Sequence, residues 1–359
     1  MKTNLDTKPT RNQPLYRKVH ARLRRAILEG ELPEGGRLPT TADLAAQFGT
    51  GICTVQKALA SLESEDLINR KQGVGTFVSS STPRLASVGI YIDDDIQRNP
   101  GSGYYRMLVE YLREMLEAEQ IDYHVFHGDY DASRTRRHLP DEVLRGIRTL
   151  KVQVLLLPVI SNVVQNVLDE IEVPCVTSVS EYFAHGVDVG IDTAGMIDQA
   201  LDLLNAAGCR RVGVVTANTS ESYPAFFRHL AEAAQARGLS LCEDRIRKPA
   251  EKKLHGSEME AFGYREMTAL AGQADRPDGV FVYPDLVGRG VILGALASGL
   301  SIPDDLRLVF HENIGMPLFR PFPAASVVVD PAAVARAYIA KARALHLNPA
   351  DTEPVLVPT

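Results

Sequence analysis

The first 80 residues show three helical patterns of apolar positions. The first predicted helix carries an apolar stripe at Leu15, Val19, Leu23 and Ile27, and arginine and lysine occupy many of its other positions. A second helix is predicted from about Thr41 to Phe48, because a hydroxyl at its start lies three residues before Asp43, as in a capping box. Gly49 is a natural stop, and a third helix follows it. The pattern predicts a helix, a tight turn and a helix.

The third predicted helix has one apolar face, formed by Val55, Ala58, Leu59 and Leu62. Its outward face is then Ile52, Cys53, Gln56 and Lys57, where a recognition helix meets base edges in a major groove. Two strand-like segments follow, 67–71 and 75–78, and they are joined through a glycine turn. This hairpin is typical of a wing whose tip approaches a phosphate closely, with Arg70 and Lys71 supplying charge.

Beyond residue 86 the pattern changes to alternating strands and helices. Nine strands are predicted, at 88–92, 123–126, 152–157, 175–178, 187–191, 212–216, 279–283, 306–310 and 326–329. Amphipathic helices are predicted between many of them, at 104–118, 136–150, 161–170, 194–207, 223–237, 259–271, 287–299 and 331–345. This alternation predicts an α/β fold with two doubly wound parallel sheets, and a ligand cleft at the carboxyl ends of their strands.

Charge is distributed unevenly between the two regions. Residues 1–85 contain 13 Lys+Arg and 8 Asp+Glu, a net charge of +5, and the remaining residues carry a net charge of −11. Lysine and arginine beside phosphates supply most non-specific affinity for DNA. We therefore expect double-stranded DNA to contact the first region alone, while the acidic body has another role.

Residues 14–78 resemble the GntR family of winged-helix bacterial transcription factors. The resemblance lies in Pro14-Leu15-Tyr16, Arg37-Leu38-Pro39, Phe48-Gly49 and Gly73-Val74-Gly75-Thr76-Phe77-Val78. It implies DNA contacts through Thr40, Thr41, Ile52, Cys53, Thr54, Gln56, Lys57, Arg70, Lys71, Gln72 and Gly73. Three positions at which many family members have arginine are Ala42, Ile52 and Gln56 in this chain. Since arginine is the usual partner of guanine, we expect an operator half-site that depends less on guanine.

Residues 86–347 resemble the ligand-sensing core of LacI-family repressors, which is of periplasmic-binding-protein type. Val189-Gly190-Ile191-Asp192, Gly208-Cys209-Arg210-Arg211-Val212 and Ile302-Pro303-Asp304-Asp305 occur in the family's order. The expected organisation is a winged helix-turn-helix domain at 1–78, a linker at 79–86, a core at 87–347 and a tail at 348–359. The resemblance divides the core into 87–185 with 310–326 and 187–309 with 327–347. The family's hinge helix is not evident, so coupling to DNA is expected through the linker and the dimer geometry.

The positions that bind sugars in LacI-type sensors are altered in this chain. The usual arginine, asparagine and aspartate align with Tyr223, Pro284 and Glu312. Aromatic faces and polar groups suited to a hydroxyl-rich ligand remain. The candidate effector-binding residues are Asp93, Tyr104, Tyr105, Glu181, Tyr223, Asp285 and Glu312. Asp285 also fits a role as a helix cap, and Asp93 belongs to a run of three aspartates that fits a solvated loop.

The remaining sequence motifs indicate no other chemistry. The four cysteines are widely spaced, which favours reduced thiols in a cytoplasmic protein over disulfides or a zinc site. His124 and His127 would face opposite sides of a short strand, so no metal site is expected. Gly288-Arg289-Gly290 lacks the context of a phosphate loop and is interpreted as helix packing at a subunit interface. No cofactor, secretion signal or membrane span is predicted.

The sequence therefore predicts a cytoplasmic, homodimeric, sequence-specific transcription regulator without enzymatic activity. A repressor of a carbohydrate-related operon is expected, released or tightened by a small-molecule effector of which sugars are the implied class. One alternative is a constitutive DNA binder whose sensor has lost its ligand. Another is an enzyme fused to a DNA-binding head, although the body contains no nucleophile-elbow or phosphate-loop motif.

Overall fold

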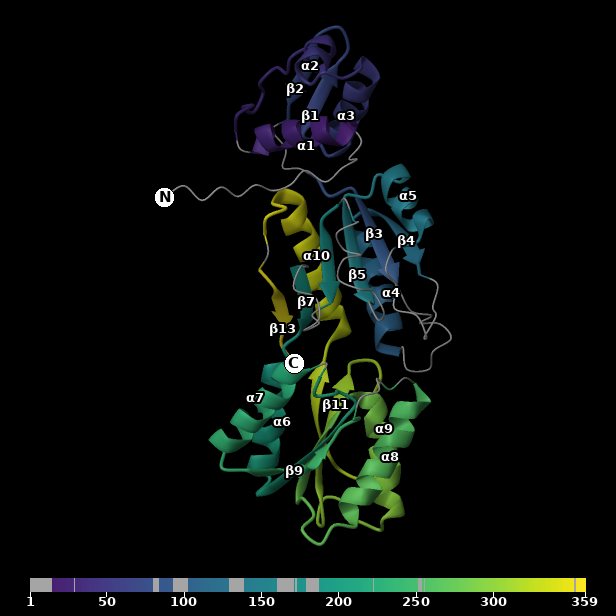
Figure 1. Ribbon diagram of the computed structural model, residues 1–359, viewed down its shortest axis with the longest axis vertical. Helices are drawn as coiled ribbons and strands as arrows, with labels where there is room; N and C mark the ends of the chain where they lie inside the picture. Colours follow the sequence, from purple (N-terminus) through teal and green to yellow (C-terminus); the bar gives the residue numbers. More distant parts are fainter. Residues whose placement is uncertain are drawn as a thin grey trace.

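The computed structural model of the 359-residue chain describes residues 15–28, 30–79, 84–92, 103–128, 139–159, 171, 173–178, 187–221, 223–250, 254, 256–351 and 353–359. Among these residues, a DNA-binding-type domain and two sheet-containing subdomains follow one another along the long axis of the molecule (Figure 1). The predicted helix at 161–170 and the candidate residues Asp93 and Glu181 lie outside the described residues.

The first domain consists of three helices and a hairpin, as the sequence predicts. Its elements are α1 (Leu15–Leu28), α2 (Thr41–Gln47), α3 (Ile52–Ser64), β1 (Ile68–Lys71) and β2 (Gly75–Val78). The apolar faces of the helices meet in one core that includes Val19, Leu44 and Leu59. A capping box formed by Thr40 and Asp43 starts α2. In the hairpin, Ile68 pairs with Val78 and Lys71 with Gly75.

The first subdomain contains a parallel sheet of six strands, in the order β13-β7-β6-β5-β3-β4. These strands are β3 (Ser87–Ile92), β4 (Asp122–His127), β5 (Val154–Val159), β6 (Cys175–Ser178), β7 (Val187–Ile191) and β13 (Val355–Val357). Two helices, α4 (Gly103–Ala118) and α10 (Pro331–Leu347), pack on one face of the sheet and contribute Leu112 and Tyr338 to its core. The opposite face is covered by α5 (Asp141–Thr149).

The second subdomain contains a parallel sheet of five strands, in the order β12-β11-β10-β8-β9. These are β8 (Arg211–Thr216), β9 (Ser240–Arg247), β10 (Gly279–Tyr283), β11 (Arg307–Asn313) and β12 (Ala325–Val329). On one face lie α6 (Thr193–Ala206) and α7 (Pro224–Ala236), and on the other lie α8 (Ser257–Ala271) and α9 (Asp285–Ala297). Figure 1 shows these two helical pairs on opposite sides of the sheet. The predicted doubly wound architecture is confirmed.

The chain divides between the subdomains differently from the expected partition. Residues 310–326, which were expected in the first subdomain, supply most of β11 and the start of β12, both of which lie in the second sheet. The helix at 331–347, which was expected in the second subdomain, packs on the first sheet. The segment expected as a tail adds β13 beside β7. The predicted assignment of these segments is wrong. The apolar side chains Val334, Tyr338 and Leu345 of α10 are buried in the core of the first sheet, and this burial holds the helix there.

The glycines of α9 allow its backbone to approach α8 closely. A Cβ atom added to Gly290 would lie 1.9 Å from the carbonyl oxygen of Glu260, and one added to Gly263 of α8 would lie 2.2 Å from the carbonyl oxygen of Val287. Gly288-Arg289-Gly290 thus serves packing between two helices of the same chain. The interpretation as packing at a subunit interface is wrong for these glycines.

Candidate nucleic-acid interface and effector site

One face of the first domain is exposed and polar around the start of α3. Ile52, Cys53, Gln56 and Lys57 are exposed, whereas Val55 and Ala58 on the inner face are fully buried. The 3.6-residue period of the helix therefore places the four predicted residues together on the outward side. Thr54 is half-buried at the edge of this face. The exposed face of α3 carries no charge before Lys57, because neither arginine nor lysine precedes that residue in the helix.

The threonines before α2 have unequal freedom to contact a ligand. The Thr40 hydroxyl donates to Asp43 Oδ2 at 2.6 Å and accepts the Asp43 amide at 3.2 Å, so it is engaged as a helix cap. Thr41, the first residue of α2, is half-buried. Ala42 is exposed, which leaves a small surface where many GntR-type domains have arginine. The Thr40 hydroxyl therefore serves helix capping.

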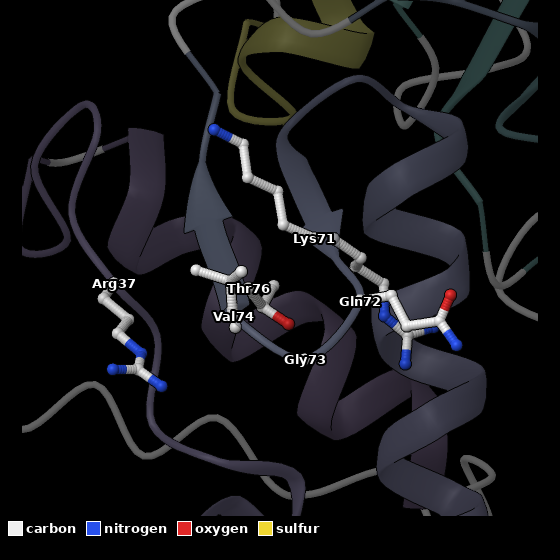
Figure 2. A pocket seen from close by; sticks show the side chains of 8 residues that line it. Arg37, Lys71, Gln72, Gly73, Val74 and Thr76 are labelled. Atoms are coloured by element: carbon white, nitrogen blue, oxygen red, sulfur yellow. The ribbon is translucent and has the colours of Figure 1, made fainter.

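The wing forms a basic pocket beside these helices. Arg37, Arg70, Lys71, Gln72, Gly73, Val74, Gly75 and Thr76 line an open space of about 360 Å³ (Figure 2). At the tip, Gly73 has a φ of +72°, a conformation that favours glycine. The Lys71 ammonium lies 5.8 Å from the centre of the Phe77 ring, and Arg70 Nη1 lies 3.9 Å from Glu63 Oε2. Four of the predicted residues, 70–73, thus share one surface.

Arg37 is a residue of this surface that the sequence reasoning missed. It pairs with Phe77 in an antiparallel bridge, and the next residue, Leu38, donates its amide to the Thr76 carbonyl at 2.8 Å. Segment 35–38 therefore lies against β2 through an isolated bridge and backbone hydrogen bonds, and it places the Arg37 side chain at the wing (Figure 2). The signal in the sequence was the arginine directly before Leu38-Pro39.

Arg24 is one of the basic residues of the first predicted helix, but in the structure it is not part of the exposed basic surface. Its side chain is 11% exposed, and its Nε donates to Glu65 Oε2 at 2.9 Å. Burial of a guanidinium is favourable only with a charged partner, and Glu65 supplies one. The basic surface available to DNA is therefore smaller than the sequence count implies.

A second polar group lies at the carboxyl ends of β10 and β11, together with the start of α4. Four predicted residues, Tyr104, Tyr105, Tyr223 and Asp285, are near Tyr283, whose pKa is raised by burial first and then by these four neighbours. Tyr104 and Tyr105 stack edge to face, with centroids 5.3 Å apart. We call this group, with His311 and Asn313, the aromatic–polar cluster. It joins residues of both subdomains.

Contacts between α4 and the loop after β11 hold the two sides of the cluster close. A Cβ atom added to Gly103 would meet the Met316 methyl group, and one added to Gly315 would lie 3.0 Å from Met107 Sδ. Burial and the adjacent Tyr105 raise the pKa of Tyr104 well above its usual range. Tyr104 and Tyr283 are half-buried, and their raised pKa values keep both phenols neutral hydrogen-bond donors at neutral pH.

Asp285 has a structural role within the cluster. It is the first residue of α9 and is 8% exposed. Its Oδ1 accepts the Leu286 amide at 2.9 Å, and its Oδ2 accepts from Asn313 Nδ2 at 3.2 Å. Both oxygens retain lone pairs, since each can accept more than one hydrogen bond. Asp285 thus fixes the helix start while still offering acceptor capacity.

His311 and Asn313 carry buried polar atoms without a partner. Within the described residues, both ring nitrogens of His311 and the Oδ1 of Asn313 make no hydrogen bond. His311 packs edge to face on Tyr283, with centroids 5.0 Å apart. Burial lowers the pKa of His311 to about 4, against the opposing effect of Asp285 and Glu312, so the ring is neutral at neutral pH. Each such orphaned atom costs about 1–3 kcal/mol unless a ligand or water satisfies it.

Glu312 has contacts outside the cluster. Its carboxylate accepts from Ser326 Oγ at 2.5 Å and pairs with Arg320, and burial is outweighed by these partners, so its pKa falls below the usual range. Because side chains alternate along β11, Glu312 points away from His311 and Asn313. The structure therefore brings four of the predicted effector residues together and does not bring Glu312 into that group.

The described residues contain no cluster of three or more histidine, cysteine, aspartate or glutamate side chains arranged to hold a metal ion. No helix among them combines the length and apolar character that a membrane crossing needs.

Comparison with protein families gives two matches along the chain. Residues 15–78 match the family of bacterial regulatory proteins described as the gntR family, and residues 201–359 match the periplasmic binding protein-like domain. Curated relatives align with the first region. The mannosyl-D-glycerate transport/metabolism system repressor of Escherichia coli is 40% identical over 67 residues, which is 19% of this chain and 28% of that protein.

Two other relatives show the same limited coverage. The transcriptional repressor NagR of Bacillus subtilis is 33% identical over 98 residues, 27% of this chain and 40% of its own. The regulator Rv1152 of Mycobacterium tuberculosis is 36% identical over 76 residues, 21% of this chain and 63% of its own. The chain therefore spans less than two thirds of each of these relatives.

Solved structures align with the larger part of the chain. A regulatory protein of the LacI family from Chloroflexus aggregans has a TM-score of 0.62 at 19% identity, covering 76% of this chain and 95% of its own. A LacI-family regulator from Lactobacillus casei with bound sucrose has a TM-score of 0.54 at 20% identity, covering 76% and 96%. At these identities the likeness shows the fold.

Proposed function

Because residues 15–78 form a GntR-type helix-turn-helix domain and a periplasmic-binding-protein-like domain of LacI type follows it, we propose that the chain is a sequence-specific transcription regulator controlled by a small-molecule effector. The observation that carries this proposal is the outward face of α3 beside the basic wing pocket. The proposal includes no enzymatic step.

The DNA contacts divide into base-reading and backbone-binding residues. We assign Ile52, Cys53 and Gln56, with Lys57, to the major groove, because they form the exposed face of α3. Thr40, Thr41 and Thr54 flank that face. The wing residues Arg70, Lys71, Gln72 and Gly73, to which the structure adds Arg37, contact phosphates or the minor groove. Gln56 fits adenine and Ile52 fits a thymine methyl group, which gives a half-site less dependent on guanine.

The effector site is the aromatic–polar cluster. Its aromatic faces, provided by Tyr104, Tyr105 and Tyr223, suit the apolar face of a sugar ring, and Asp285 and Asn313 Oδ1 accept hydrogen bonds from hydroxyl groups. A neutral His311 adds a donor and an acceptor without charge. We propose a neutral hydroxyl-rich molecule, with sugars as the class, and we retain Asp93, Glu181 and Glu312 only as peripheral candidates.

A homodimer would present two DNA-binding domains to two half-sites. Large exposed apolar side chains occur on α9 and in the loop after β11, where Leu293 is 59% exposed and Phe319 is 90% exposed. A contiguous apolar surface is what an interface between two copies requires. We propose that a second copy of the chain covers it, that the dimer works in the cytoplasm where bacterial DNA lies, and that it represses a carbohydrate-related operon.

The proposal is tested by selecting bound DNA from a random pool with the full chain at low salt. Enrichment of a two-fold symmetric sequence supports it, and a pool that stays random contradicts it. The selected DNA is then titrated with D-glucose, D-ribose and sucrose while the melting temperature of the protein is recorded. A sugar that binds the folded chain raises the melting temperature by mass action. Release of DNA by that sugar indicates induction, and tighter binding indicates corepression.

A further inference from the structure

Arg84 joins the DNA-binding domain to the first subdomain through two hydrogen bonds. Its backbone amide donates to the Glu65 carbonyl at 3.0 Å, and its Nη2 donates to the Gln120 carbonyl at 2.8 Å. The His346 ring lies beside Arg84 in the lining of the same small cavity. These contacts involve the residue that caps the carboxyl end of α3, the turn after α4 and the last turn of α10.

Glu65, the attachment point on the DNA-binding domain, is held rigidly. Its side chain is 3% exposed, and its two oxygens contact His20 Nε2 at 2.5 Å and Arg24 Nε at 2.9 Å. Burial opposes ionisation, but His20 and Arg24 outweigh it and hold the pKa of Glu65 below its usual range. Since His20 and Arg24 belong to α1, the end of the recognition helix and α1 form one rigid unit.

The other two partners of Arg84 lie at the ends of helices that reach the effector site or the second subdomain. The first turn of α4 carries Tyr104 and Tyr105, and its 16 residues extend about 24 Å to the turn that contains Gln120. Beside it, α10 starts directly after β12 of the second sheet and ends next to His346. Figure 1 shows the carboxyl end of α10, in yellow, beneath the DNA-binding domain.

The junction also encloses a small cavity. Arg84, Leu85, Glu119, Ile121, Arg343 and His346, with Leu347, line a space of about 230 Å³. His346 is 5% exposed, its Nε2 has no hydrogen-bond partner in the described residues, and burial lowers its pKa to about 4. A neutral, well-packed ring thus lies beside Arg84 in the junction.

We propose that Arg84 is a positioning residue that fixes the recognition helix on the ends of α4 and α10. Displacement of either helix by an effector at Tyr104 and Tyr105 would then move α3 relative to the operator. The signalling part of this inference rests on the proposed function, whereas the docking of the DNA-binding domain does not. Arg84 thus takes the place of a hinge helix between sensor and DNA.

The four cysteines of the chain allow the docking to be measured without new attachment sites. Cys53 on α3 and Cys242 on β9 are exposed. Burial raises the pKa of Cys175 to about 12 and also raises that of Cys209, so these thiols react slowly with labelling reagents at neutral pH. Nitroxide labels at Cys53 and Cys242 report the distance between the DNA-binding domain and the second subdomain by pulsed electron paramagnetic resonance.

The experiment uses the full chain without DNA or sugar, diluted with unlabelled chain so that only distances within one molecule are seen. We expect a narrow distance distribution in the unchanged protein, and a distribution broader by about twofold or more in Arg84→Ala, which loses the hydrogen bond to Gln120, and in His346→Leu, which removes the imidazole that lines the junction cavity. Arg336→Ala, which removes an exposed ion pair with Asp330 at the other end of α10, should stay narrow.

A broad distribution in the unchanged protein, or an unchanged width in both Arg84→Ala and His346→Leu, would overturn the proposal. Circular dichroism of each variant establishes that it is folded, and the exposed side chain of Arg84 makes that variant decisive if His346→Leu does not fold. Because neither DNA nor sugar is present, this result is independent of the DNA selection that tests the proposed function.

Discussion

Replacing His346 by glutamine should reduce the acid sensitivity of the fold. The ring lies in the last turn of α10, 5% exposed, and burial followed by the charge of Arg24 lowers its pKa to about 4. Glu65 and the Arg84 backbone oppose this effect. Glutamine cannot be protonated in this range, and its amide keeps a polar side chain at this position. The substitution therefore removes the titration while keeping a neutral polar group.

The magnitude follows from linkage between protonation and folding. In the unfolded chain the pKa of histidine is about 6.5, so the folded value is depressed. Stability from the neutral ring is fully present above the unfolded pKa, and it is lost as the pH falls from 6.5 toward 4. The loss is about 2 kcal/mol near pH 5 and about 3 kcal/mol below pH 4.

The assay is urea unfolding near pH 7 and near pH 5, followed by circular dichroism. The unchanged protein should lose stability on acidification, and His346→Gln should lose about 2 kcal/mol less. His311→Gln should behave similarly, because burial lowers the pKa of that histidine to about 4 as well. His229→Gln, at a partly exposed position, is the matched control. If His346→Gln and the unchanged protein lost the same free energy, the reasoning about the buried ring would be refuted.

Three further predictions concern the interface and the fold. Lys71→Ala should weaken binding to all DNA sequences alike and reduce the slope of the logarithm of the binding constant against the logarithm of salt concentration by about 0.9. Gln56→Ala should instead relax the preference at one base position by about 1–3 kcal/mol. Fluorescence anisotropy distinguishes the two variants, and identical effects would contradict the assigned contacts. Gly290→Ala should lower the free energy of unfolding by about 1–3 kcal/mol, because the added Cβ atom meets the Glu260 carbonyl. Gly272→Ala is the control, since its added Cβ atom lies 3.7 Å from the nearest neighbouring atom. Equal melting temperatures of the two variants would show that the helices adjust freely. Val357→Asp places a charge at a residue that is 7% exposed in the first core and should lower the melting temperature, while the same change at Leu356, 53% exposed, is the control that should leave it nearly unchanged.

The sequence predicts nine strands of the two sheets and misses two, β9 and β13. In β9, the segment Ser240–Arg247 has mostly charged or polar residues and pairs with β8 alone, at the edge of the sheet. β13 has three residues and is ordered by pairing with β7. Edge strands bury little apolar surface, so their sequences contain only a weak pattern from which the strand and its pairing could be predicted. The wrong assignment of residues 310–347 has another origin, since that partition was taken from the resemblance to LacI-type cores.

The candidate sites were predicted to different extents for a similar reason. The outward face of α3 follows from helical spacing alone, and the exposed residues are the predicted ones. The aromatic–polar cluster needs contacts between α4, β10 and β11 that no local pattern contains. His311 and Asn313 were missed although Glu312 between them was selected, because alignment with a sugar-binding aspartate was given more weight than the two-residue alternation of a strand.

The path of the chain between the two sheets has a consequence for synthesis on the ribosome. The second sheet is built from one continuous stretch, β8 to β12, and is complete once residue 329 has emerged. At that stage of synthesis the first sheet still lacks α10 and β13, so its core remains partly uncovered while the second subdomain already folds. Vectorial synthesis therefore completes first the subdomain that lies farthest from the DNA-binding domain. The nascent DNA-binding domain acquires its docking platform only when α10 arrives, which makes the junction at Arg84 a late step in maturation.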